Sequence, residues 1–138
     1  MTTHALVTEP SDLIDFDDLL SASELELRNQ VREFVQAEIK PYIAAWYEDA
    51  HFPLEIVPKM AELGLLGMHL DGYGCAGRSA VEYGLAGAEL EAGDSGLRTF
   101  VSVQGSLAMS AIHKHGSEEH KQQWLPAMAA GQAIGCFG

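Results

Sequence analysis

The chain has 138 residues, about the length of one domain. Hydrophobic residues make up 47% and charged residues 20%, proportions typical of a globular protein and unlike those of a disordered chain. Acidic residues outnumber basic ones by 20 to 8, for a formal net charge of -12. Because a nucleic-acid backbone or an anionic lipid surface would repel this charge, we expect neither nucleic acid nor membrane as a partner.

The amino-terminal segment is acidic and carries no targeting pattern. Seven acidic residues precede Arg28, the first basic residue, so residues 1–20 are interpreted as a solvated acidic arm rather than an acidic binding tail. The segment has neither a basic signal-peptide start nor an Arg-rich transit pattern. Cys75 and Cys136 fit no metal or redox spacing, which favours buried thiols in a reducing compartment over a disulfide. These features predict a bacterial cytoplasmic protein.

The first half of the chain predicts three helices. Ser21 and Glu24 have capping-box spacing, and the helix that they open ends at Lys40, since proline follows. A second short helix follows Pro41. A third covers residues 54–63 and ends at Gly64, with Pro58 expected to delay its start or bend it.

The middle of the chain predicts a loop and then a helix. Residues 64–77 are punctuated by glycine and are interpreted as loop. Ser79 and Glu82 form a second capping-box pair that opens a helix to about Ala92. Gly84 and Gly87 share a face of this helix, and close packing against a neighbouring backbone would explain their cost to helix stability.

Two more helices and a strand are predicted in the remainder. Asp94 or Ser95 caps a helix that ends at Gly116, and Ser117 caps a last helix that Pro126 breaks or restarts. The apolar tail of residues 132–138 has strand character. The fold class is therefore all-α, a bundle of about six helices over residues 21–131 that ends in the first residues of a β-strand.

The helix after Asp94 carries one charged residue, Arg98, over residues 95–112, and its other positions are small or apolar nearly all round. Such a helix is expected to be enclosed by others, and its positive end disfavours a cation. One interpretation is a structural ion pair with Glu91 or Asp94. The other is an arginine fork for a ligand carboxylate or phosphate. Residue types alone favour the ion pair, since structural pairs are common.

Other candidate sites are weaker. His113 and His115 are two apart on a helix and point away from each other, and no Cys or carboxylate set accompanies them, so we predict no metal site. The GYGCAG run lacks a strand-to-helix switch and is interpreted as a surface turn rather than a phosphate loop. Trp46 and Trp124 are expected in the core rather than stacked on a cofactor.

Several runs of sequence together carry a family resemblance. They include GYGCAG at residues 72–77, YGL at 83–85, ELE at 89–91, DSG before Arg98, SVQGSL at 102–107, and HGSEEHKQQWLPAMAAG leading into GCFG. In these runs the chain resembles the amino-terminal domain of acyl-CoA dehydrogenases, most specifically the glutaryl-CoA dehydrogenases. The resemblance covers nearly all of residues 16–138.

The resemblance implies a three-domain flavoenzyme, usually a homotetramer, in which FAD takes hydride from an acyl-CoA and electron transfer flavoprotein reoxidises the FAD. In the glutaryl branch the product also loses carbon dioxide to give crotonyl-CoA. The resemblance further implies that residues 132–138 begin a middle β domain, and that the flavin motif and the catalytic glutamate follow Gly138. We therefore expect no catalytic residue among these 138 and no activity from them alone.

The resemblance also assigns site residues. Arg98 matches the arginine that pairs with the distal carboxylate of the substrate, Thr99 stands where serine is commoner, and Glu91 matches the acid that hydrogen-bonds with this pair. Phe137 and Gly138 match the start of a flavin-contacting strand. The alternatives are another acyl-CoA dehydrogenase or oxidase, against which Arg98 argues, and a non-catalytic helical interaction module, against which the apolar tail argues.

Overall fold

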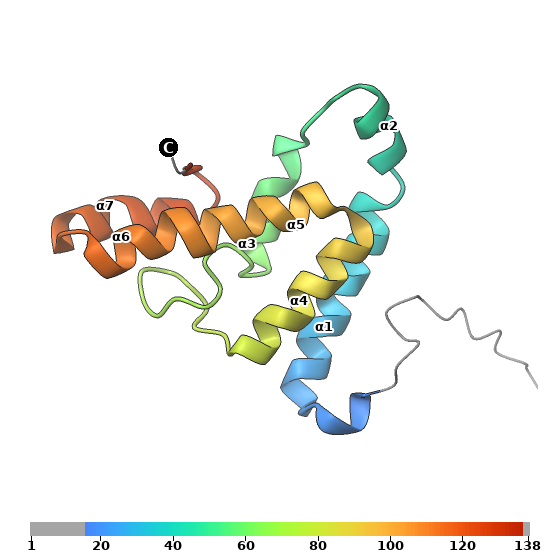
Figure 1. Ribbon diagram of the computed structural model, residues 1–138, viewed down its shortest axis with the longest axis horizontal. Helices are drawn as coiled ribbons and strands as arrows, with labels where there is room; N and C mark the ends of the chain where they lie inside the picture. Colours follow the sequence, from blue (N-terminus) through green and yellow to red (C-terminus); the bar gives the residue numbers. More distant parts are fainter. Residues whose placement is uncertain (1–15, 137–138) are drawn as a thin grey trace, which may run out of the picture.

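The computed structural model describes residues 16–136, so most of the predicted acidic arm, residues 1–20, lies outside the described residues. The described part consists of helices joined by loops (Figure 1). One limb holds α1 (Ala22–Phe34) and α4 (Ala80–Gly93) side by side, and the other holds a long helix with α7 (Glu118–Ala129) beside it. No helix in residues 16–136 is both long and apolar enough to cross a membrane.

The first helix begins at the predicted capping box. The Ser21 hydroxyl accepts from the Glu24 amide at 3.3 Å, and the Ser21 amide donates to the Glu24 carboxylate at 2.7 Å. The helix continues through a π-helical turn, η3 (Val35–Ile39), and stops before Pro41 as predicted. Its buried face carries Leu27, Val31, Val35 and Ile39.

Two short helical segments follow. They are α2 (Ile43–Glu48) and α3 (Val57–Glu62), the latter entered through a 3-10 turn, η4 (Leu54–Ile56). Pro58 lies in the first turn of α3, where its missing amide costs no helical hydrogen bond, so the helix starts late instead of bending. Gly64 ends it with a φ of 69°, a conformation that favours glycine.

The predicted loop and second capping box are confirmed. Residues 63–79 contain no helix, and the glycines of the GYGCAG run form turns with positive φ rather than a phosphate loop. The Ser79 hydroxyl then accepts from the Glu82 amide at 3.1 Å, and the Ser79 amide donates to the Glu82 carboxylate at 2.9 Å. This box opens α4.

The helix after Asp94 is continuous. It consists of α5 (Ser95–Ser102), a π-helical segment η5 (Val103–Met109) and α6 (Ser110–His115). The Asp94 carboxylate caps it by accepting from the Leu97 amide at 2.7 Å. The π-helical segment was not predicted, because its sequence satisfies the ordinary helical period equally well.

The last helix corrects two predictions. Pro126 does not break α7, which runs from Glu118 to Ala129 with the proline inside it. The described tail, residues 130–136, forms no strand, because a strand needs a neighbouring strand to bond with and residues 16–136 supply none. With α5, η5 and α6 taken as one helix, the described part holds six helices, which confirms the all-α class.

The helices enclose two separate clusters of buried side chains. The first core joins α1, η3, α3, α4 and α5 through Leu27, Val31, Val35, Ile39, Ile56, Val57, Met60, Leu65, Leu66, Met68, Ala86, Leu90, Leu97 and Val101. The second core lies between η5 and α7 and contains Leu70, Ala108, Met109, Leu125, Met128 and Ala129. Cys75 is half-buried beside the second core, Cys136 is exposed, and both are free thiols.

Candidate functional site

The predicted site residues meet where α4 ends and α5 begins. Arg98 lies in the first turn of α5, and its Nε donates to the Glu91 carboxylate on α4 at 2.6 Å. The Ser95 hydroxyl donates to the other oxygen of the same carboxylate. Hydrogen bonds from Ser95 and then from Arg98 hold the pKa of Glu91 below its usual range. The two helices are therefore joined at this corner by a charged pair.

The enclosure predicted for Arg98 is wrong for this chain. The side chains of Arg98 and Glu91 are 40% and 45% exposed, and Thr99 beside them is exposed as well. The reason is that α5 buries the face of Leu97 and Val101. Arg98 therefore lies at the edge of the buried face, where its side chain is open to solvent and also lines a small cavity.

That cavity has a volume of about 160 Å³. It lies between α4 and α5 and is lined by Met68, Tyr83, Gly84, Ala86, Gly87, Leu90, Arg98, Val101 and Ser102. Sites that bury a whole drug-sized ligand measure roughly 300–1,000 Å³, so this one would accept a short end of a ligand. Among the residues that line the cavity, Arg98 alone carries a positive charge.

The two glycines of α4 face this cavity. A Cβ atom built at Gly84 or at Gly87 would meet nothing within 4 Å. The prediction that a neighbouring backbone packs closely against them is therefore wrong for the described residues. Their missing side chains leave open space in the wall of the cavity instead.

The lining of the cavity includes two residues with hydroxyl groups, Tyr83 and Ser102. The Tyr83 hydroxyl lies 2.9 Å from the Ser106 hydroxyl and 3.5 Å from that of Ser102. The His69 ring stands edge-on to Tyr83, with ring centroids 5.3 Å apart. This group of polar side chains around Tyr83 was missed from the sequence, because its members come from three segments with no shared motif.

His69 is an unusual member of this group. Its Nε2 lies 3.1 Å from the Ser110 hydroxyl, while its Nδ1 is buried and has no hydrogen-bond partner among the described residues. Burial lowers the pKa of His69, and the charges of Lys114 and His113 lower it further. Both effects favour the neutral imidazole.

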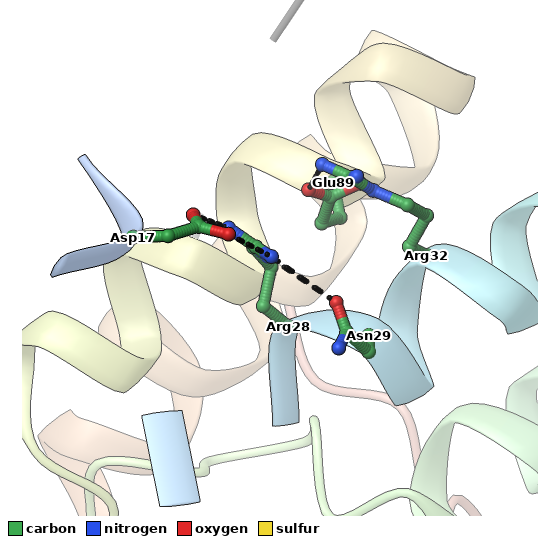
Figure 2. Close-up of polar contacts among 5 residues, drawn as sticks. All are labelled: Asp17, Arg28, Asn29, Arg32 and Glu89. Carbon is green, nitrogen blue, oxygen red and sulfur yellow. Dashed lines mark hydrogen bonds and ion pairs between the residues drawn. The ribbon is translucent and has the colours of Figure 1, made fainter. Parts of the chain in front are cut away.

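A second carboxylate of α4 faces the opposite way. Glu89 is 4% exposed and accepts from Arg32 of α1 at 2.7 and 2.9 Å, as Figure 2 shows. Asp17 and Arg28 form a further ion pair on the same side of the molecule. Residues two apart on a helix point to different faces, so Glu89 joins α4 to α1 while Glu91 remains available to Arg98.

An open apolar groove of about 610 Å³ lies at the other end of the molecule. It runs between α6, α7 and the tail, and its lining includes His115, His120 and Trp124. Trp124 is 45% exposed, so its predicted core position is wrong, whereas Trp46 packs against the first core. Within residues 16–136, no three His, Cys, Asp or Glu side chains are grouped as metal ligands.

The two predicted flavin contacts, Phe137 and Gly138, lie outside the described residues. The segment that leads to them is held in a defined path, since the Gln104 side chain bonds to the backbone of Ala133 and Gly135, both at 2.9 Å. The flavin contact of Phe137 and Gly138 stays a prediction.

Comparisons with known proteins agree with this architecture. Residues 21–132 match the family described as acyl-CoA dehydrogenase, N-terminal domain. A crystal structure of glutaryl-CoA dehydrogenase from Mycobacterium smegmatis is similar at 64% identity and a TM-score of 0.88, over 93% of this chain and 33% of that one. A second, from the same organism and in complex with FADH2, has 56% identity and a TM-score of 0.89, over 94% and 34%.

A curated relative gives the same family. The short-chain specific acyl-CoA dehydrogenase of Clostridium acetobutylicum is 36% identical over 126 residues, which cover 91% of this chain and 33% of that protein. The chain thus spans about a third of the length of the relatives that it matches. The predicted resemblance is confirmed: this chain belongs to the acyl-CoA dehydrogenase family, as an amino-terminal domain.

Proposed function

We propose that the full-length protein containing this chain is an FAD-dependent dehydrogenase that oxidises and decarboxylates glutaryl-CoA to crotonyl-CoA. The observation that carries the proposal is the Arg98 guanidinium, paired with Glu91 at 2.6 Å and lining a small cavity. A purely aliphatic acyl group offers no partner for a cation at this place. A glutaryl group ends in a carboxylate, which does.

The geometry of Arg98 suits a carboxylate. Its Nε is occupied by Glu91, while its two terminal nitrogens have no hydrogen-bond partner among the described residues. These nitrogens are spaced to donate together to the two oxygens of a carboxylate. Glu91 orients the guanidinium, and the hydroxyl of the neighbouring Thr99 is the proposed additional donor.

The similarity to the glutaryl-CoA dehydrogenase of Mycobacterium smegmatis supports this substrate, and the FADH2 in its related structure supports FAD as the cofactor. When bound, FAD accepts hydride from the β-carbon of the acyl group. Phe137 and Gly138 are the proposed flavin contacts within this chain. The α-proton would be removed by a glutamate beyond Gly138, so we propose that residues 1–138 alone are inactive. Electron transfer flavoprotein and a homotetrameric assembly are further proposals from family membership.

A substrate panel tests the proposal. The full-length protein is assayed with glutaryl-CoA and with butyryl-CoA, and the crotonyl-CoA and carbon dioxide that form are measured. We expect a higher kcat/KM for glutaryl-CoA and release of carbon dioxide. A preference for butyryl-CoA would favour the second candidate, a short-chain acyl-CoA dehydrogenase, which the identity to the Clostridium acetobutylicum enzyme supports.

A further inference from the structure

Gln104 is a buried polar side chain that bonds to the end of α7 and to the tail of the chain. It lies in the π-helical segment η5 and is 1% exposed. Its amide nitrogen donates to the carbonyl of Ala133 at 2.9 Å and to that of Met128 at 3.3 Å. Its amide oxygen accepts from the Gly135 amide at 2.9 Å. Both ends of one side chain thus hold three points of the backbone.

The tail, residues 130–136, also packs closely against the helices. A Cβ atom at Gly135 would lie 2.6 Å from the Ala108 Cβ and 2.7 Å from the Met128 Cε, so only glycine allows the backbone this near to the helix. On another side of η5, a Cβ atom at Gly105 would lie 3.1 Å from the backbone nitrogen of Gly67. The π-helical segment is therefore held between a loop and the tail.

This arrangement connects the two parts of the proposed site. Arg98 and Gln104 belong to the same continuous helix, α5 followed by η5. Gly135, which Gln104 holds, precedes Phe137 by two residues. The position of the substrate-side arginine and the path of the chain toward the flavin are thus set by one helix. Loss of a buried amide would leave the tail carbonyl and amide groups unpaired, which favours movement of the tail.

We propose that Gln104 is a positioning residue for the cofactor: it fixes the path of residues 133–135, the segment that leads to the proposed flavin contacts. The inference rests on the proposed function, because it assumes that Phe137 and Gly138 contact FAD. Gln104 itself touches neither substrate nor cofactor. Its effect passes through the backbone of the tail.

The test uses the full-length protein with the variant Gln104→Leu, which keeps a side chain of similar volume but removes all three hydrogen bonds. We expect hydrogen exchange at the Gly135 amide to be at least about tenfold faster, and the Kd for FAD to rise about tenfold, as loss of two to three neutral hydrogen bonds would give. The KM for glutaryl-CoA should change less than about twofold, because Arg98 and Glu91 are untouched.

Two further variants make the result specific. Gln122→Leu is the matched control, since Gln122 is exposed and bonds only to Glu118 at 2.9 Å among the described residues. It should leave both the Gly135 exchange and the FAD affinity unchanged. Gln104→Asn retains both the donor and the acceptor on a side chain one carbon shorter, so it cannot reach all three partners and should give an intermediate FAD affinity. Gln104→Asn also serves if Gln104→Leu does not fold.

Each outcome decides between distinct conclusions. Faster Gly135 exchange in a folded variant with an unchanged Kd for FAD would overturn the positioning role and leave Gln104 a structural residue. An equal loss of FAD affinity in Gln122→Leu would overturn it as well. A wild-type protein that binds no FAD would instead contradict the proposed function from which the inference starts.

Discussion

The two cores of the domain differ in how completely they are covered. The first core contains fourteen buried residues from α1, η3, α3, α4, α5 and their connections, and the Arg32–Glu89 ion pair joins two of its helices, α1 and α4. The second core contains six, and the groove along it exposes apolar side chains such as Trp124 and Ile134. The first core is the larger of the two, and we expect the groove along the second core to be an interaction surface.

The largest effect on the free energy of unfolding is expected at the Arg32–Glu89 ion pair beside the first core. Glu89→Gln removes the charge of a carboxylate that is 4% exposed and breaks its ion pair with Arg32, whose atoms lie 2.7 Å apart. We expect the free energy of unfolding to fall by about 3 kcal/mol. Urea unfolding of residues 1–138 measures it.

Its control is Glu38→Gln, which removes the carboxylate of the exposed Lys59–Glu38 pair. That change should cost less than about 1 kcal/mol. Equal costs for the two variants would mean that burial of the Arg32–Glu89 pair does not distinguish the first core.

The open groove beside the second core should cause copies of the chain to associate with one another. Residues 1–138 are expected to self-associate through the groove despite the net charge of -12. Trp124→Ser removes a large apolar side chain from the groove and should weaken association by roughly tenfold, since burial of such a side chain contributes about 1.5–3 kcal/mol. Sedimentation velocity over a wide concentration range measures this.

Val81→Ser is the matched control, because Val81 is 49% exposed and does not line the groove. It should leave association unchanged. A wild-type fragment that sediments as a monomer at every concentration would break the comparison between the two cores.

A smaller effect of opposite sign is expected in the cavity wall. Gly87→Ala should raise the free energy of unfolding by about 1 kcal/mol, because alanine favours the helix and its Cβ would meet nothing within 4 Å. Gly93→Ala on the same helix should lower it, since its Cβ would lie 2.6 Å from Val35 Cγ1. Thermal unfolding of both variants checks the signs. Destabilisation by Gly87→Ala would show that the cavity beside Arg98 is filled.

The smallest effect concerns pH and His69. Burial lowers the pKa of this imidazole, so the unfolded chain takes up a proton near pH 6.5 and the folded chain only at lower pH. Stability contributed by the neutral ring is therefore complete above pH 6.5 and is lost as the pH falls below it. His69→Gln should flatten the pH dependence of unfolding in this range. An identical slope in the variant would contradict this account.

Local signals predicted most of the fold. Both capping boxes, the Asp94 cap and the helix end at Gly64 depend on residues within a few positions of one another, and each was found. The Arg32–Glu89 pair was missed because its partners are 57 residues apart and no motif joins them. The strand predicted for the tail was wrong for the described residues because strand formation depends on a partner strand.

The candidate site likewise combines features that local sequence signals predict with features that depend on distant contacts. Charge and nearness in the sequence predicted Glu91 or Asp94 as the partner of Arg98, and the structure contains the pair with Glu91. The exposure of Arg98 and the open space at Gly84 and Gly87 depend on what lies opposite them in three dimensions. Sequence spacing predicts which residues share a face, but it does not reveal whether that face meets a backbone or a cavity.

The central proposal, that Arg98 binds a distal carboxylate, is tested most directly by Arg98→Met in the full-length protein. This change keeps the side-chain volume and removes the charge. We expect kcat/KM for glutaryl-CoA to fall by at least about 2 to 3 kcal/mol, roughly 30- to 150-fold, while kcat/KM for an uncharged acyl-CoA of similar length falls much less or rises. An equal loss on both substrates, together with a lower melting temperature, would contradict the carboxylate-binding role and make the Arg98–Glu91 pair structural.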